Sequence, residues 1–457
     1  MNVPIEESMQ MSTQLPSRRL TLIGLNEFSV DLLTRGASEL KLKNIEHVLS
    51  MKSATTTTDD MVEHRGLDPW VQWVSIHTGV PSSAHGVMHL GDTPSALEVS
   101  QVWEKLSSVG VSSGIWGAMN ATREGATHCD FFLPDPWTFS EIAYPDELGD
   151  LLALPRYYSK NYLDVSKGQF LACTMRLVRF ILGSGAILDL LKQIPLVLGG
   201  VFRNGVNNAL LFSLFDLFSA VFFVKYKKRY SPQFSLVFLN SIAHLQHHRW
   251  GKEKLLKDAV FGLRVIDRVL GIIFAAREQG EAIIIMNALT QKNIVGEKPR
   301  ICYRQINPER FLSTVKIPFR SVEQLMTNDA HVFFHSESDR DAAARALEDV
   351  TLCDKPLFQV ERNGLDPNKL FYQVDFWDEL SGGEPVAVNG VEIDYFDHFE
   401  AIVARTGAHV RTGNVYYEGL ELPPQLYNHE IANRILNYFS VSDASSRGEA
   451  ASLTKAF

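Results

Sequence analysis

The chain has 457 residues, 45% hydrophobic and 21% charged, which is the composition of a globular protein long enough for more than one lobe. Its net charge of −9 and pI near 5.9 exclude a typical nucleic-acid-binding protein, because such proteins carry a basic surface. The four cysteines lie far apart without a CxxC pair, so neither a zinc ribbon nor a dense disulfide framework is expected. The N-terminal residues lack the apolar core of a signal peptide, and we therefore expect a cytoplasmic protein.

Three short apolar runs predict the parallel strands of an α/β core. Residues 20–25 (LTLIGL), 234–240 (FSLVFLN) and 282–286 (AIIIM) are apolar without alternation, which is typical of strands buried on both faces. A helix with an apolar stripe is expected over about 255–279, between the second and third strands. Loops after parallel strands meet at one edge of a sheet, so Asn26 and Glu27, directly after the first strand, are expected at a ligand-binding edge.

Two insertions are expected to interrupt this core. Residues 151–230 have helical apolar spacing with glycine and proline between the helices, which predicts a helical cap. Within it, residues 209–224 are apolar nearly all round, but they are fewer than the ~20 of a membrane span and contain Asp216. A buried cap helix is therefore favoured over a transmembrane span, and peripheral contact of the basic run that follows (KYKKRY) with anionic lipid is a second interpretation.

The second insertion has a strand–helix–strand–strand (βαββ) pattern over residues 304–378. The chain would resume its core afterwards with a helix from about Asp394 and end in a polar, disordered tail. The predicted domains are thus a core in three parts (18–150, 231–303 and 379–440), the helical cap (151–230), the βαββ insertion (304–378) and the tail (441–457).

The most specific motif lies in the stretch from Asp68 to Gly86 and reads T-G-x-P-x-x-x-H-G. Glycine reaches backbone conformations closed to other residues, and proline fixes φ. The motif therefore predicts the end of a helix followed by a turn of defined backbone conformation. This stretch resembles the segment that follows the nucleophile in type I phosphodiesterase/nucleotide pyrophosphatase enzymes of the alkaline phosphatase superfamily. The residues in register with that pattern are Trp73, Ser75, Thr78, Gly79, His85 and Gly86.

The resemblance implies an alkaline phosphatase-like fold, with a central, mostly parallel sheet and helices on both faces, and a site for two metal ions, usually zinc. Most positions of that site are changed here. The family's first-strand Asp is Asn26, its nucleophile is Pro69, the Asp of its D-x-x-x-H motif is Ala243, and its S-D-H-G motif reads Asn287 to Thr290. Neutral side chains cannot offset the charge of two divalent cations, so the ordinary two-metal site is not expected.

What remains is enough for a single open metal site, of zinc or manganese, because one carboxylate and two histidines suffice. On the resemblance, we expect Glu27, His247 and His409 as metal ligands. Asp68 and His247 are the expected catalytic residues, and the expected substrate contacts are Asn26, Asn287 and Gln291. The same imidazoles could instead serve acid–base catalysis without metal, or be remnants that hydrogen-bond the loop backbone.

Two functions follow from these predictions. The first is a divergent phosphodiesterase-like hydrolase or transferase that acts on a phosphorylated or sulfated metabolite or glycan. The alternative is a catalytically inactive relative that binds a ligand or a partner through the same cleft. Tyr303 and Arg304, which follow the changed S-D-H-G position, are further candidates for binding an anion or a sugar.

Overall fold

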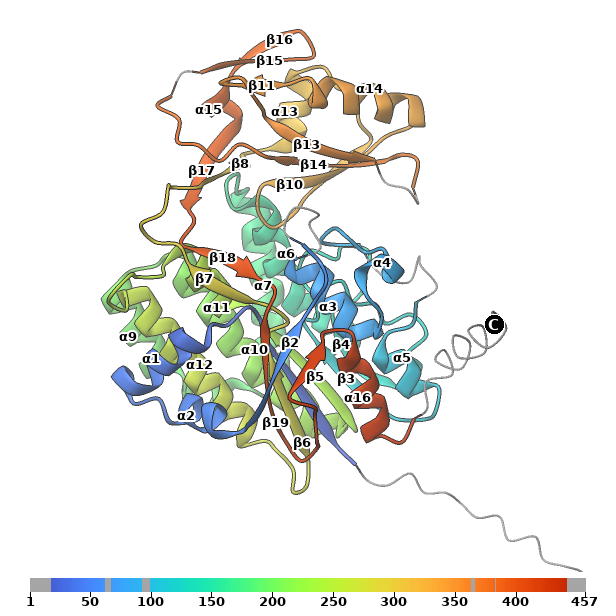
Figure 1. Ribbon diagram of the computed structural model, residues 1–457, viewed down its shortest axis with the longest axis vertical. Coiled ribbons are helices and arrows are strands. Elements are labelled where there is room, and N and C mark those ends of the chain that lie inside the picture. Colours follow the sequence, from blue (N-terminus) through green and yellow to red (C-terminus); the bar gives the residue numbers. More distant parts are fainter. Residues whose placement is uncertain (1–17, 62–66, 93–98, 363–365, 383, 442–457) are drawn as a thin grey trace, which may run out of the picture.

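The computed structural model describes residues 18–61, 67–92, 99–362, 366–382 and 384–441. The chain forms a large α/β body with a smaller lobe at one end (Figure 1). All but the first residue of the predicted tail, 441–457, lies outside the described residues.

An eight-stranded sheet forms the centre of the body. Its strands are β1 (Leu20–Leu25), β2 (Lys52–Thr57), β3 (Ser113–Trp116), β4 (Cys129–Leu133), β5 (Phe234–Leu239), β6 (Ala282–Met286), β19 (Gly413–Glu418) and β20 (Gln425–Tyr427). They lie in the order β20-β2-β19-β6-β1-β5-β3-β4, and every strand except β19 runs in the same direction. The three strands predicted from apolar runs are neighbours, with Leu22 of β1 between Leu236 of β5 and Ile284 of β6. The predicted mostly parallel α/β sheet is confirmed.

Helices cover both faces of this sheet. One face carries α1 (Val30–Leu40), α2 (Lys43–Ser50), α10 (Asn208–Tyr230), α11 (Ser241–His248) and α12 (Lys257–Phe274). The other carries α3 (Pro69–Thr78), α5 (Val102–Ser107) and α16 (Glu430–Tyr438), with the single turn α4 (Ser82–His85) after α3. Successive strand residues point to opposite faces, so Ile23 packs in the first hydrophobic cluster and Leu22 in the second. The helix expected over about 255–279 is α12 and ends earlier, at Phe274.

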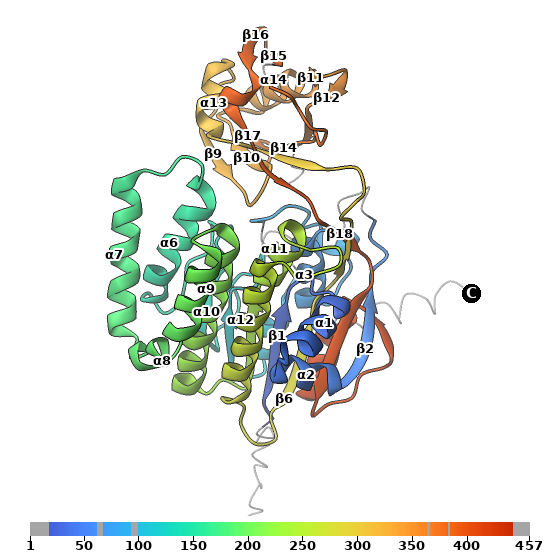
Figure 2. The ribbon, with the colours of Figure 1, turned by 90° about the vertical axis from the view of Figure 1, so that its left-hand side faces the viewer.

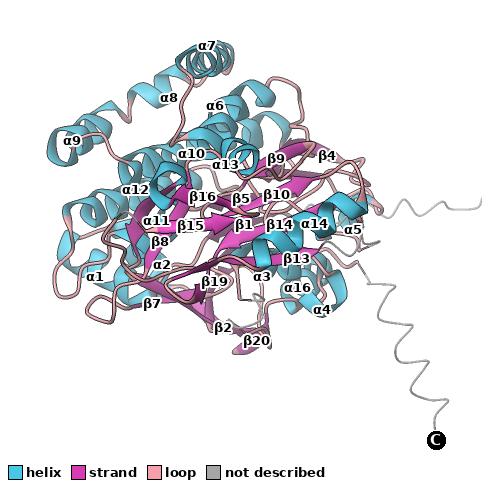
Figure 3. Cartoon of the chain, turned by 90° about the horizontal axis from the view of Figure 1, so that it is seen from above, coloured by secondary structure: helices cyan, strands magenta, loops and turns pink. Residues whose placement is uncertain are grey.

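The segment predicted as a cap is helical. It begins with α6 (Leu148–Asn161), α7 (Lys167–Gly183), α8 (Ile187–Leu191) and α9 (Ile194–Asn204), and it ends with α10. Figures 2 and 3 show α7, α8 and α9 as an outer layer, with α10 and α12 between them and the sheet.

Helix α10 is the apolar helix that the sequence assigns to the interior. It is long and apolar enough to cross a membrane, but 56% of its apolar window is buried inside the fold. Its one acidic residue, Asp216, is buried and accepts hydrogen bonds from the backbone N–H groups of Asn240 (3.3 Å) and Ser241 (2.8 Å). These bonds hold the turn after β5 to α10, and α10 is therefore a core helix.

The small lobe contains the predicted βαββ unit as β10 (Asp329–Phe333), α14 (Glu337–Glu348), β13 (Phe358–Arg362) and β14 (Lys369–Val374). With β9 (Ser321–Gln324) these strands form an antiparallel sheet in the order β13-β14-β10-β9. The lobe's hydrophobic cluster runs from Tyr303 to Phe399 and so extends into the predicted third core segment, 379–440. The helix expected after Asp394 is only a single turn, α15 (Tyr395–His398), which packs in the lobe. The other elements of the lobe are α13 (Pro308–Thr314), β11 (Thr351–Leu352), β12 (Lys355–Pro356), β15 (Pro385–Val388) and β16 (Val391–Asp394).

Two antiparallel strand pairs lead from the body into the lobe and back. The outer pair is β8 (Ile301–Gln305) with β17 (Phe399–Ala404), and the inner pair is β7 (Thr290–Asn293) with β18 (Gly407–Val410). Because β7 follows β6 closely, the inner pair lies at the carboxyl edge of the large sheet, on the side of the body that faces the lobe (Figure 1).

Candidate metal centre

Three polar side chains from distant parts of the sequence meet at this edge. Glu27 lies in the turn after β1, and His247 lies near the end of α11, which follows β5. His409 lies in β18, where it pairs in register with Gln291 of β7. The parallel order of β5, β1 and β6 brings the three loops together, as expected at the carboxyl edge of such a sheet.

The Glu27 carboxylate and the two imidazoles converge closely. Glu27 Oε2 lies 2.9 Å from His247 Nε2 and 3.2 Å from His409 Nε2, and the two Nε2 atoms are 3.4 Å apart. In a tetrahedral zinc site with bonds of about 2.0–2.1 Å, neighbouring ligand atoms are about 3.3 Å apart. The triangle therefore has the size of one face of a tetrahedral metal site. Glu27 is 3% exposed, whereas the imidazoles are 14% and 15% exposed, so the site is accessible from the histidine side.

The three groups differ in charge. Burial alone would raise the pKa of Glu27, but the charges of His409 and His247 hold it well below its ordinary value. Burial lowers the pKa of His247 to about 4. Burial also acts to lower the pKa of His409, but the charge and hydrogen bond of Glu27 outweigh it and raise that pKa. Without metal, the carboxylate of Glu27 is thus held ionised, His247 favours its neutral form, and of the two imidazoles His409 is the one that holds a proton more strongly.

Neighbouring side chains fix the Glu27 carboxylate. Its backbone has φ 57°, a left-handed conformation that is uncommon outside glycine, and its N–H donates to the carbonyl of Asn287 at 3.2 Å. Asn26 Nδ2 donates to Oε1 at 3.0 Å, and Gln291 Nε2 donates to Oε2. Asn26 and Gln291, the expected substrate contacts, are thus in the site, where each donates a hydrogen bond to Glu27.

Helix α3 in turn holds Asn26. The indole Nε1 of Trp73 donates to Asn26 Oδ1 at 2.8 Å, and Asn26 Nδ2 also donates to Asn240 Oδ1 at 2.7 Å. Gly24 of β1 makes room for the indole, because a Cβ at that position would lie 2.8 Å from the Trp73 ring. The close packing of α3 on β1 is therefore part of what orients the Glu27 carboxylate.

Asn287, the third expected substrate contact, joins the loops of the site. Its Nδ2 donates to the carbonyl of Phe28 at 2.7 Å, and its Oδ1 accepts from the backbone N–H of Asn414 at 2.8 Å. The side chain is fully buried. The structure thus places Asn287 behind the site, where it links the turn after β1 to β19.

Asp68 lies beside His409. It is the N-cap residue of α3, and its Oδ1 is 3.8 Å from His409 Nδ1, where its charge contributes to the raised pKa of His409. A carboxylate behind the second ring nitrogen is the arrangement that orients metal-binding histidines. The next residue, Pro69, is the first residue of α3 and carries no hydroxyl at the position where the resembled family has its nucleophile.

The motif from Thr78 to Gly86 supports the fold. Gly79 ends α3 in a left-handed conformation with φ 83°, as the predicted helix end requires. His85 Nδ1 accepts from the backbone N–H of Val87 at 3.1 Å, so the proton of the neutral ring is on Nε2, which donates to Ser75 Oγ at 3.0 Å. Burial lowers the pKa of His85 to about 4 and keeps the ring neutral. The buried Ser75 hydroxyl thus ties α3 to the turn.

The remaining candidates from the sequence lie elsewhere. Arg304 is buried in β8, and its guanidinium donates to the carbonyls of Leu325 (3.0 Å) and Ser159 (2.9 Å), so it joins the small lobe to the cap. Tyr303 packs in the lobe and donates to the carbonyl of Asp378 at 3.1 Å. The prediction that this pair binds an anion or a sugar is therefore wrong, because both side chains already donate hydrogen bonds to backbone carbonyls.

Arg405 is a site residue that the sequence reasoning missed. Its Nη1 lies 3.4 Å from His247 Nδ1, and its guanidinium stands 5.3 Å from the centre of the Trp377 ring. Within the described chain its Nε is buried without a hydrogen-bond partner. A guanidinium whose Nη1 lies beside the triangle has the charge and planar donor geometry that suit a phosphate or sulfate group. Its position at the start of RTGAHVRTG, the run that contains His409, was the available signal.

A second cluster with metal-ligand chemistry, His89, Asp92 and His331, lies between the body and the small lobe. His89 Nδ1 is 3.5 Å from Asp92, and its Nε2 is 2.8 Å from Glu361 of the lobe, while Lys369 also pairs with Asp92. Burial acts to lower the pKa of His89, but the hydrogen bonds to both carboxylates outweigh it and raise that pKa. Because an imidazolium and a lysine already neutralise these carboxylates, we assign this cluster to joining the lobe to the body.

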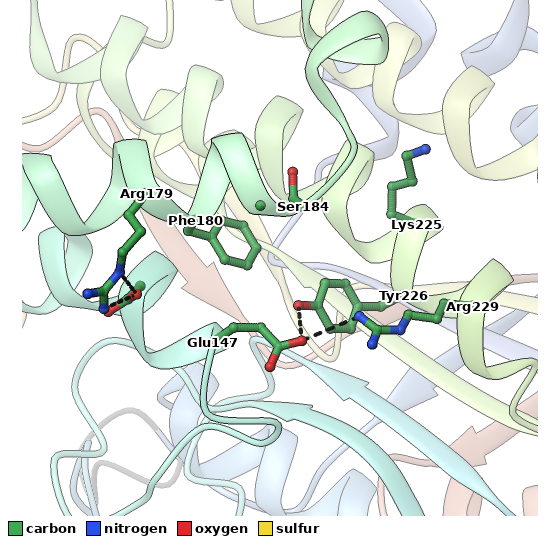
Figure 4. Close-up of a pocket in the computed structure, with 9 residues that line it drawn as sticks. Glu147, Arg179, Phe180, Ser184, Lys225, Tyr226 and Arg229 are labelled. Atoms are coloured by element: carbon green, nitrogen blue, oxygen red, sulfur yellow. Dashed lines mark hydrogen bonds and ion pairs between the residues drawn. The ribbon is translucent and has the colours of Figure 1, made fainter.

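A pocket of about 380 Å³ lies between α6, α7 and α10 (Figure 4). Four of its charged residues pair with one another, Arg179 with Asp150 and Arg229 with Glu147 (3.4 Å), while Lys225 pairs with Asp189 outside the lining. The Glu27 site contributes nothing to its lining, so this pocket is separate from the candidate metal centre.

No family model and no curated protein matches this sequence. Among solved structures, the chain is similar to murine ectonucleotide pyrophosphatase/phosphodiesterase 5, with 8% identity, a TM-score of 0.45 and coverage of 93% of this chain and 96% of that one. It is also similar to phosphonoacetate hydrolase from Sinorhizobium meliloti 1021, with 11% identity, a TM-score of 0.42 and coverage of 93% and 97%. At these identities and scores the likeness concerns the fold alone, and the chemistry of the site depends on this chain's own residues.

Proposed function

We propose that this protein is a phosphodiesterase-like hydrolase that uses one divalent metal ion, zinc or manganese, on a small molecule or glycan carrying phosphate or sulfate. The observation that supports this most is the triangle of Glu27 Oε2, His247 Nε2 and His409 Nε2, with edges of 2.9, 3.2 and 3.4 Å. One carboxylate and two imidazoles with an open fourth position are the ligand set of known catalytic zinc sites.

In this proposal each residue has a defined task. Glu27, His247 and His409 bind the ion, and the Asp68 carboxylate, 3.8 Å from His409 Nδ1, favours this ring orientation through its charge. Arg405 binds the anionic group of the substrate beside His247. When bound, the ion supplies a water of lowered pKa and positive charge for the ester oxygens.

Attack by water, rather than by a protein side chain, follows from Pro69. An enzyme-bound intermediate at that position would need a hydroxyl, and proline has none. Direct attack by water is a single displacement, which inverts the configuration at phosphorus, whereas two successive displacements retain it. Hydrolysis of a phosphorothioate diester of known configuration in water labelled with an oxygen isotope should therefore give the labelled monoester with inverted configuration at phosphorus.

A second candidate, a binding protein without catalysis, is favoured by one observation. The Glu27 carboxylate already receives hydrogen bonds from Asn26, Gln291 and both imidazoles. A buried carboxylate with four donors is stable without a metal ion. In that case Arg405 would bind an anionic ligand that is not turned over.

Metal content and turnover measured on the same samples separate the two candidates. The purified protein is stripped with a chelator and reloaded with zinc or manganese, and hydrolysis of chromogenic phosphate diesters, phosphate monoesters and sulfate esters is followed. The variants His247→Ala and His409→Ala test the ligands. His335→Ala, at an exposed histidine of the small lobe, is the matched control.

The hydrolase predicts one bound ion per chain, metal-dependent turnover, and loss of both in the two ligand variants but not in the control. A protein that takes up no metal and turns over none of these esters, yet binds inorganic phosphate or sulfate in a manner that Arg405→Gln abolishes, would support the binding protein instead.

A further inference from the structure

The outer helices α7, α8 and α9 expose an unusual share of the chain's large apolar side chains. Of the twenty such side chains exposed in the described residues, thirteen lie between Phe170 and Leu211. Single exposed apolar residues are ordinary on a protein surface, but a concentration of them marks a binding face. The thirteen are Phe170, Leu171, Met175, Val178, Leu182, Ile187, Leu188, Leu191, Ile194, Leu198, Phe202, Val206 and Leu211.

Helix α7 has two apolar stripes on different faces. One stripe packs against the core and consists of Leu177, Phe180 and Ile181. The other recurs every three or four residues, is between 41% and 67% exposed, and consists of Leu171, Met175, Val178 and Leu182. A helix that only covered a core would need the first stripe alone. The second stripe is therefore available for a partner outside the described fold.

Helix α9 repeats this pattern. Val197 and Val201 pack against the core, while Ile194, Leu198 and Phe202 recur every four residues and are exposed, Phe202 to 83%. Figure 3 shows α7, α8 and α9 together as one outer layer of the body. The exposed stripes of α7 and α9 both belong to this layer, and we call its apolar exposed surface the outer helical face.

The same segment is basic in an acidic protein. From α7 to α9, residues 167–204 contain five Lys or Arg and one Asp, although the whole chain has a net charge of −9. Of the arginines on the outer helices, Arg176 and Arg179 both pair with Asp150 of α6, whereas Arg203 lies in the last turn of α9. Lys227, in the basic run that follows the apolar part of α10, is buried and pairs with Glu281 at 2.5 Å, so it does not belong to this surface.

We propose that the outer helical face is a docking surface for an anionic lipid bilayer. Apolar side chains flanked by Lys and Arg on surface helices are the features of segments that lie in the membrane interface. A second copy of this chain fits less well, because docking face to face would bring the two basic segments together. The face would lie on the membrane and not cross it, since α7 has 17 residues and α9 has 11, fewer than the ~20 of a span.

Vesicle flotation of the full-length protein tests this proposal. Wild-type protein is mixed with phosphatidylcholine vesicles, with or without phosphatidylglycerol, at low and high salt. We expect flotation with the anionic vesicles, weaker binding to the neutral ones, and a decrease with salt, because salt screens the attraction of the basic residues.

The triple variant Leu171→Gln/Leu182→Gln/Phe202→Gln removes three exposed side chains that touch little of the core. Its affinity for anionic vesicles should fall at least about tenfold, since each removed side chain is worth about that factor when it leaves water. Ile142→Gln is the matched control, because Ile142 is 79% exposed but lies outside the outer helices. It should float like the wild type.

Three results would overturn the proposal. These are no flotation of the wild type with anionic vesicles, equal flotation of the triple variant, and a dimer measured by light scattering that the triple variant dissociates. The last result would assign the face to a second copy of the chain. All three readouts are independent of metal binding and turnover at Glu27.

Discussion

Replacing Glu27 with glutamine should abolish the stabilisation of the protein by zinc. Glutamine keeps the size of the side chain but removes the only negative charge in the triangle and leaves two imidazoles as ligands. Zinc at 100 times its dissociation constant stabilises a folded protein by about 2.7 kcal/mol. A loss of at least about 100-fold in affinity would leave about 0.4 kcal/mol at the same zinc concentration.

Without metal, Glu27→Gln will also differ from the wild type in its free energy of unfolding. Each protein must therefore be compared with and without zinc. Glu27 accepts hydrogen bonds from two imidazoles and two amides, and bonds to a charged group contribute about 1.5–3 kcal/mol each. Part of this loss is offset, because His409 can release its proton once the carboxylate is gone. The informative quantity is therefore the change in unfolding free energy on adding zinc.

Denaturant unfolding of the stripped proteins, with and without zinc or manganese, measures this change. Wild type and His335→Ala should gain about 2–3 kcal/mol from a saturating ion, and Glu27→Gln less than about 0.5 kcal/mol. Equal gains in the wild type and in Glu27→Gln would show that the ion binds elsewhere. No gain in the wild type at any zinc concentration would refute the metal centre itself.

Three further predictions concern other contacts. His89→Gln should lower the free energy of unfolding by about 1–3 kcal/mol at pH 6, because His89 donates to Glu361 at 2.8 Å. Since the pKa of His89 is raised in the folded protein, this loss should shrink above pH 6.5 as the pH rises through the folded pKa, which urea unfolding across pH measures. Lys227→Met should lower the free energy of unfolding, measured in urea, by about 3–5 kcal/mol, because it leaves the buried Glu281 carboxylate without its lysine partner. Arg405→Gln should raise the KM for an anionic ester about tenfold while zinc uptake, measured by metal analysis, stays unchanged.

The sequence predicts the centre of the fold well, because its strands are buried on both faces. Residues 20–25, 234–239 and 282–286 are strands with every residue buried. The small lobe is harder to delimit. Its hydrophobic cluster uses Val386, Val388 and Tyr395, and short apolar runs of this kind do not show which of two cores they join.

For the site, the sequence predicts location better than role. Glu27 and His247 meet because parallel β1 and β5 end at one edge, and His409 joins them because β18 pairs with β7 at the same edge. Whether Asn26 and Gln291 face a ligand or the carboxylate depends on side-chain directions, which spacing does not reveal, and both donate to Glu27. Arg405 escaped notice because a lone arginine before a turn has no characteristic spacing.

The number of ions the site can hold follows from its charges. Asn26, Ala288 and Leu289 are buried and neutral, so Glu27 is the only buried anion among the ligand positions, and Arg405 adds positive charge beside His247. One divalent ion is offset in part by Glu27 and Asp68, whereas a second would lie among neutral groups near a guanidinium, at a cost of several kcal/mol.

The backbone of Glu27 argues against a site that is only a remnant. Its left-handed φ of 57° costs about 1–3 kcal/mol in a residue with a side chain. Burying the carboxylate adds a further cost, and a well-packed apolar residue in place of a buried charge is often neutral or stabilising. Mutation without selection for the site would relieve both costs at once, for example by glycine at this position. The chain instead keeps a buried carboxylate on a strained turn, 2.9 and 3.2 Å from two imidazoles, with Asn26 and Gln291 holding it there. Strain and buried charge kept together at the carboxyl edge of a parallel sheet support the proposed metal centre.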